Sequence, residues 1–126
     1  MDLGFVHVGP WELEGSKPQI VLGDYAKLCP ALYAFVQGQQ VVYVGKTART
    51  LKQRMQNYKT PGSTQRTSTR NHNSIVDSIG NGYSINLYVL KNVDPIEYKG
   101  VVINLAAGLE DPLIKLIRPK WNLTGH

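Results

Sequence analysis

The 126-residue chain is poor in cysteine and has no long apolar segment. Cys29 is its single cysteine, so no disulfide can form within the chain, and no cluster of Cys and His has zinc-site spacing. No apolar run approaches the roughly 20 residues that a membrane helix needs. The first ten residues lack the basic and apolar regions of a secretory signal. We therefore expect a cytoplasmic protein with one domain over residues 1–126.

Acidic residues are missing from a long central part of the chain. None occurs between Asp24 and Asp77, although the whole sequence has nine acidic and fourteen basic residues and a net charge of +5. A stretch of one sign indicates a surface that binds a polyanion such as nucleic acid. A merely solvated face is the alternative, but such faces usually mix both signs. Eight basic residues lie in this stretch: Lys27, Lys46, Arg49, Lys52, Arg54, Lys59, Arg66 and Arg70.

The apolar pattern sharpens after residues 1–30, which we expect to be an irregular N-terminal arm with one short strand near residues 19–22. Residues 31–37 and 40–44 are rich in aromatic and β-branched side chains and flank a Gly38-Gln39 step, which predicts a β-hairpin. Residues 83–90 alternate as a third strand. The hairpin is apolar on both faces, so it belongs inside a sheet. We expect an α/β (α+β) fold, a small three-stranded antiparallel central sheet flanked by helices.

Two helices are predicted between the hairpin and the third strand. Thr50 is placed to cap a helix through Leu51, Met55 and Tyr58, which share one face. Residues 60–70 are expected to form a mobile loop.

A second helix, capped by Asn73, is expected to end at residues 80–82. The Gly80-Asn81-Gly82 step lacks the further glycine and the lysine of a phosphate-binding loop, so nucleotide hydrolysis is not expected. Residues 101–117 are helical in character, and the Asp111-Pro112 step predicts a boundary or kink within them. Trp121 is expected to be buried against the sheet.

Cleavage of a phosphodiester bond needs an activated water, positive charge beside the phosphate and relief of charge on the leaving oxygen. Lys46 and Arg54 follow the hairpin and could both lie at one end of the sheet, where they would meet phosphate oxygens. Tyr33 and Tyr43 lie on the paired strands. Two nearby cations would lower a tyrosine pKa from its reference value of about 10 and create a general base. Half-buried packing residues are the simpler explanation of strand tyrosines.

These residues belong to a longer spaced pattern. Ala31-Leu32-Tyr33 stands ten residues before Tyr43-Val44-Gly45, and Lys46, Arg54 and Tyr58 follow. This pattern resembles the first half of the GIY-YIG nuclease signature, with Leu and Val in place of its isoleucines. Many members carry a histidine where this chain has Tyr58, a tyrosine that the excision-repair branch shares, and Arg54 lies one residue further along than expected.

The C-terminal part resembles the second half of the same signature. Glu110 on an expected helix is followed by Leu113, Ile117, Pro119 and the final Asn122, as the signature has a glutamate, a proline and an asparagine. The resemblance covers residues 31–122, the expected catalytic core. A chain of this size looks most like the small restriction-type or phage-type endonucleases.

The resemblance implies a role for each matching residue. Glu110 would hold a single Mg²⁺, or Mn²⁺ in its place, and Arg54 would grip the scissile phosphate. Tyr33 would be the base toward the attacking water, and Lys46 would lower the tyrosine pKa. The implied catalytic set is Tyr33, Tyr43, Lys46, Arg54, Tyr58, Glu110 and Asn122, with Tyr43 beside the phosphate and Asn122 ordering the site.

The resemblance implies hydrolysis of double-stranded DNA to 5′-phosphate and 3′-hydroxyl ends. A symmetric double-strand cut by one site per chain calls for a homodimer or homotetramer. His72 in the basic segment touches DNA, assists proton transfer or is a plain surface-loop histidine, and Asp111 is either a further metal ligand or a helix cap. The residues expected to contact DNA are Arg49, Lys52, Lys59, Arg66, Arg70 and His72.

Two other functions remain open from the sequence. The first is a non-catalytic module that binds DNA or RNA through the basic face while the tyrosines pack or stack. The second is a basic protein whose partner is an acidic protein surface. The nuclease and the nucleic-acid-binding module should both bind nucleic acid and lose that binding steeply as salt rises, which separates them from a protein with an acidic protein partner.

Overall fold

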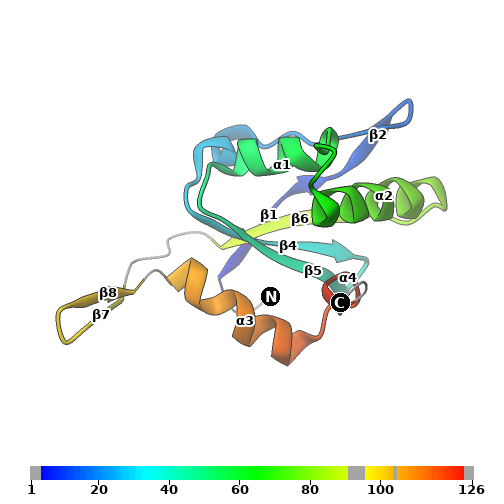
Figure 1. Cartoon of the computed structure of the whole chain (residues 1–126). Helices are drawn as coiled ribbons and strands as arrows, with labels where there is room; N and C mark the ends of the chain where they lie inside the picture. The colour runs from blue at the N-terminus through cyan, green and yellow to red at the C-terminus, as the bar shows by residue number, and fades with distance from the viewer. Residues whose placement is uncertain (1–3, 91–95, 104, 124–126) are drawn as a thin grey trace.

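The computed structural model describes residues 4–90, 96–103 and 105–123. Its centre is a four-stranded antiparallel sheet with the strand order β1-β6-β4-β5. Helices α1 and α2 cover one face of this sheet, and α3 covers the other (Figure 1). The strands are β1 (Phe5–Pro10), β4 (Ala31–Gln37), β5 (Gln40–Thr47) and β6 (Ile85–Leu90). The helices are α1 (Leu51–Lys59), α2 (Arg66–Gly80), α3 (Leu105–Ile117) and α4 (Lys120–Leu123).

Strand β4 lies inside the sheet and is buried on both faces, as its apolar sequence predicts. Tyr33 and Phe35 pack into the core beneath α1 and α2, whereas Leu32 and Ala34 pack on the side of α3. Gly38 supplies the positive φ of 61° for the turn into β5. The predicted hairpin is confirmed.

The N-terminal segment is more regular than predicted. Strand β1 pairs with β6 and adds a fourth strand to the three expected ones, and Trp11 is buried in the core. The short strand expected near residues 19–22 is wrong, because the strand there ends at Gln19. Strand β1 is an edge strand, only partly buried and ending in glycine and proline, so its alternation is weak. The other elements before β4 are β2 (Glu12–Glu14), β3 (Lys17–Gln19) and the 3-10 helix η1 (Gly23–Lys27).

Helix α1 begins and packs as predicted. The Thr50 hydroxyl accepts a hydrogen bond from the Gln53 N–H, and the Gln53 side chain accepts one from the Thr50 N–H, which completes a capping box. Leu51, Met55 and Tyr58 are fully buried. The face that these three share is therefore the face that packs on the sheet.

Helix α2 begins earlier than predicted. It starts at Arg66, so the loop expected over residues 60–70 is shorter, and the cap expected at Asn73 is wrong. No side chain caps its N-terminus, and its first turns bury the polar residues Ser68 and Asn71. Polar residues on the buried face hide the apolar periodicity by which a helix is recognised.

The C-terminal part departs from prediction in two places. The first three residues of the segment that was expected to be helical, 101–117, instead form strand β8 (Val101–Ile103), which pairs with β7 (Ile96–Tyr98). Pro112 lies inside α3, so the boundary expected there is wrong, although a proline does remove one helical hydrogen bond. Trp121 is buried and meets Phe35 edge to face, as expected. In the described parts of the chain, no helix is long and apolar enough to cross a bilayer.

Candidate active site

Three tyrosines from three elements meet beneath α1. Tyr33 of β4, Tyr43 of β5 and Tyr58 of α1 have ring centroids between 6.2 and 6.4 Å apart. Tyr33 and Tyr58 are fully buried, and their hydroxyl oxygens lie 2.6 Å apart in a hydrogen bond. Both rings are core residues, and their hydroxyls form a polar point within that core.

Gly45 leaves the space that this cluster needs. It faces Tyr33 across the pairing of β4 with β5. A Cβ atom on residue 45 would lie 2.6 Å from both Cζ and the hydroxyl oxygen of Tyr33 and 2.8 Å from the Tyr43 ring. Close-packed interiors do not contain such contacts. Glycine is therefore required by the two rings, a role that the sequence pattern alone does not reveal.

Arg54 reaches the same polar point from α1. Its Nε donates to the Tyr33 hydroxyl at 3.1 Å, and its Nη1 donates to the Ser68 Oγ at 2.9 Å. The guanidinium carbon lies 4.4 Å from the centre of the Tyr58 ring, in a cation–π contact. Ser68 was missed from the sequence because it fell within the expected loop. Arginine has further N–H donors on both terminal nitrogens, so the fork can still bind an anion.

The surroundings of Tyr33 oppose its ionisation. Burial raises its pKa far above the ordinary value, Tyr43 raises it further, and Arg54 only partly compensates. Burial likewise raises the pKa of Tyr58. The expected lowering of a tyrosine pKa by Lys46 and Arg54 is therefore wrong for Tyr33, because desolvation outweighs the nearby cation. Tyr33 keeps its proton here.

Glu110 of α3 stands beside the end of β5. Its side chain is 19% exposed, and its Oε1 lies 3.8 Å from the Lys46 Nζ. Burial raises the pKa of Glu110, while the positive charge of Lys46 and, more weakly, of Arg54 acts in the opposite direction. The structure thus brings the motif carboxylate within electrostatic reach of both motif cations.

A hollow of about 380 Å³ opens beside Glu110. Tyr43 is the motif tyrosine that lines it, whereas Tyr33 lies deeper. Asp111 also lines the hollow and lies within α3, so the helix cap expected of it is wrong. The full lining is Tyr43, Thr67, Arg70, Glu110, Asp111, Ile114, Trp121 and Asn122.

The donor set of the hollow fits one hard divalent cation. Among the described residues, no three His, Cys, Asp or Glu side chains gather as metal ligands. Mg²⁺ keeps several waters and is commonly bound by one or two carboxylates together with substrate phosphates. A partly desolvated Glu110 that borders an open hollow suits this mode of binding.

Asn122 ties α4 to the open edge of β5. Its Oδ1 accepts from the Val44 N–H at 2.8 Å, and its Nδ2 donates to the Val44 carbonyl at 2.8 Å. Val44 stands between Tyr43 and Gly45, and β5 is the last strand of the sheet. The amide therefore takes the place of a neighbouring strand and fixes the segment that carries the motif residues.

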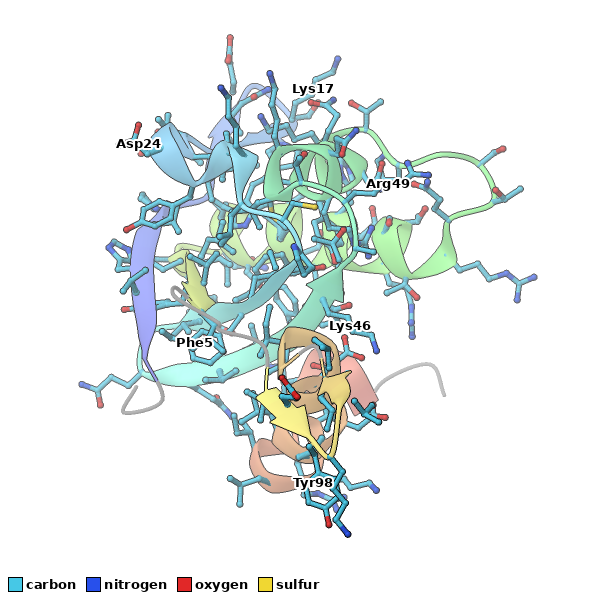
Figure 2. The ribbon with its side chains drawn as sticks, turned by 90° about the vertical axis from the view of Figure 1, so that its left-hand side faces the viewer. Phe5, Lys17, Asp24, Lys46, Arg49 and Tyr98 are labelled. Carbon is cyan, nitrogen blue, oxygen red and sulfur yellow. The ribbon has the colours of Figure 1, made fainter. Side chains whose placement is uncertain are left out.

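The predicted DNA-contacting residues lie before α1, on α1 and on α2. Arg49, Lys52 and Arg66 are exposed, whereas Lys59 and Arg70 are partly exposed. Figure 2 shows Arg49 and Lys46 on one side of the molecule, away from Phe5 and Asp24.

His72 is not a loop residue, because α2 includes it. It is partly buried, and its Nδ1 donates to the Tyr58 carbonyl at 2.6 Å, which links the two helices. The surface-loop interpretation is therefore wrong.

This combination of sheet, tyrosine cluster and helix carboxylate occurs in a known fold. The chain has the fold of the GIY-YIG nucleases, which the spaced residues predicted. No protein-family model matches the chain, and no curated protein sequence matches it significantly.

Two solved structures carry this assignment of the fold. A mutant of bacteriophage T4 EndoII superposes with a TM-score of 0.72 at 19% sequence identity, over 97% of this chain and 94% of that one. The restriction endonuclease Hpy188I, in complex with product DNA, superposes with a TM-score of 0.54 at 13% identity, over 98% of this chain and 82% of that one. At these identities the likeness establishes the fold.

Proposed function

We propose that this protein is a metal-dependent DNA endonuclease, a phosphodiester hydrolase that acts as one domain and leaves 5′-phosphate and 3′-hydroxyl ends. The observation that carries the proposal is the fixed Arg54 guanidinium, which lies within electrostatic reach of Glu110 in this fold. A carboxylate that borders a solvent-open hollow, with a cationic fork within its electrostatic reach, supplies parts that phosphodiester hydrolysis needs.

Arg54 is assigned to the scissile phosphate. Its Nε donates a hydrogen bond to the Tyr33 hydroxyl, and the face of the guanidinium contacts the Tyr58 ring. The group is therefore held in one orientation before the substrate binds. Preorganised donors stabilise the charge that develops in a transition state without reorganising during the reaction. Lys46 at the rim of the site adds a second positive charge.

Glu110 is assigned to Mg²⁺, for which Mn²⁺ would substitute. The bound ion would neutralise phosphate charge and polarise an attacking water. Tyr43 borders the same hollow and is assigned to that water and the phosphate. A base role for Tyr33 stays a prediction, because its hydroxyl holds its proton and serves Arg54 in this state.

Double-stranded DNA is the proposed substrate, and a restriction-type or phage-type role in the cytoplasm is the proposed setting. The basic residues before and along α1 and at the start of α2 support DNA binding. The fold shared with a phage enzyme and a restriction enzyme supports the subclass. A homodimer or homotetramer is proposed, because one site per chain cuts one strand.

Digestion of supercoiled plasmid at low salt with Mg²⁺ or Mn²⁺ tests the proposal. The wild type and the control Glu97→Ala, an exposed glutamate on β7, should nick or linearise the plasmid, and Glu110→Ala or a chelator should abolish cutting. The products should be rejoined by DNA ligase, which needs 5′-phosphate and 3′-hydroxyl ends. A folded protein that binds DNA but cuts no duplex, nicked or branched substrate would instead be a binding module.

A further inference from the structure

Arg54 is held by a residue outside the motif as well as by the motif tyrosines. Ser68 lies in the first turn of α2 and is 3% exposed. Its Oγ accepts from Arg54 Nη1 at 2.9 Å. The resemblance to the nuclease signature runs through β4, β5, α1, α3 and α4 and assigns nothing to this helix. Ser68 is thus a contact to the phosphate-binding group for which the motif has no role.

The two hydrogen bonds hold different ends of the guanidinium. Tyr33 accepts from Nε, at the end nearer the aliphatic chain, and Ser68 accepts from Nη1, at the outer end, so the planar group is held at two points. The Tyr58 ring supports one face of that plane. One N–H of Nη1 and both of Nη2 then remain for an anion. Without Ser68, only the Nε end would keep a hydrogen bond within the protein, and the outer nitrogens could shift.

The same turn of α2 carries two of the proposed DNA contacts. Arg66 begins the helix, and Arg70 lines the hollow beside Glu110. Ser68 lies between them in sequence and points to Arg54 from a buried position. DNA bound to the exposed side of this turn of α2 would therefore contact the same helical turn that holds Arg54 through Ser68.

On the basis of the proposed nuclease function, we propose that Ser68 is a positioning residue that holds the outer end of the Arg54 guanidinium, so that its free N–H groups face the scissile phosphate. The juxtaposition that carries this proposal is a nearly fully buried hydroxyl that is hydrogen-bonded to a cation within electrostatic reach of Glu110. A hydrogen bond to a charged group is among the stronger ones in proteins.

Kinetics provide the first test. Ser68→Ala should lower kcat roughly 10- to 100-fold and change KM by less than about twofold, because it misorients an otherwise intact phosphate ligand. Ser74→Ala, on the same helix, is the matched control and should cut like the wild type. In the Arg54→Ala background, Ser68→Ala should cause no further loss. An unchanged kcat in Ser68→Ala, or an equal loss in both backgrounds, overturns the proposal.

Nuclear magnetic resonance of the free protein provides a readout that needs no activity. The Arg54 Nε–H signal, identified by its absence from Arg54→Lys, should be sharp and protected from water exchange in the wild type. It should shift and exchange faster in Ser68→Ala but not in Ser74→Ala. If the wild type cuts no DNA, the nuclease function fails on its own, and this signal still decides whether Ser68 holds Arg54. An identical signal in Ser68→Ala refutes the positioning role.

Discussion

Replacement of Gly45 by alanine adds a single methyl group but should displace the hydroxyl of Tyr33. The new Cβ would lie 2.6 Å from the Tyr33 hydroxyl, so that hydroxyl must retreat by about 0.8 Å to reach an ordinary contact of 3.4 Å. It cannot retreat freely, because it is bonded to Tyr58 at 2.6 Å and to Arg54 at 3.1 Å. A misplacement of about 1 Å near the chemistry can cost roughly 100-fold in rate.

Two quantities should therefore fall in Gly45→Ala. The free energy of unfolding should drop by about 2 kcal/mol, as overpacked cores typically do, and the cleavage rate of the folded fraction should drop roughly 100-fold. Gly9→Ala is the matched strand control, because its Cβ would meet only the Val21 carbonyl at 3.8 Å. Thermal unfolding and plasmid cleavage measure both effects. Wild-type stability and rate in Gly45→Ala would refute the steric argument.

Three further predictions follow from the same contacts. Asn122→Leu removes both hydrogen bonds to the Val44 backbone and should lower the free energy of unfolding, measured by denaturant titration, by about 2 kcal/mol. Unchanged stability would contradict the role of Asn122 in fixing the edge of β5. Since burial raises the pKa values of Tyr33 and Tyr58 above the unfolded value of about 10, the stability that they contribute is present below that pH and is lost as the pH rises toward their folded values. Absorbance titration should then show these two tyrosines ionising only with unfolding, whereas normal titration of all seven in the folded protein would contradict their burial. Arg66→Ala should weaken duplex binding and make the fall of log K with log salt concentration shallower by roughly 0.9, because one phosphate contact is lost. Lys17→Ala on β3 should leave that slope unchanged. The same slope in Arg66→Ala as in the wild type would show that Arg66 does not contact DNA.

The central part of the fold was readable from the sequence because its signals are local. A strand that is apolar on both faces, a glycine turn and a capping threonine at residue 50 identify β4, β5 and α1. Each signal depends on residues within a few positions of one another. The same locality places Tyr33 and Tyr43 on paired strands and Arg54 on the following helix, which is why the motif could be recognised.

The misread parts depend on contacts between distant segments. Strand β1 is stabilised by pairing with β6, about eighty residues away, and its own pattern is weak. Helix α2 buries Ser68 and Asn71 against the rest of the protein, so its buried face lacks the apolar periodicity that predicts a helix. The sign of the Tyr33 pKa shift was also misjudged, because burial is a property of the folded core and cannot be read from neighbouring cations in sequence.

The central claim is that Glu110 serves cleavage and is not needed for DNA binding, and Glu110→Gln tests this directly. This variant keeps the shape of the side chain but removes the charge that would hold Mg²⁺. Wild type and variant are compared for binding and for cutting of one labelled DNA duplex with Mg²⁺. The account predicts that the wild type cuts, and that Glu110→Gln binds with similar affinity but does not cut. A Glu110→Gln protein that cuts at the wild-type rate, or a wild type that only binds, would contradict it.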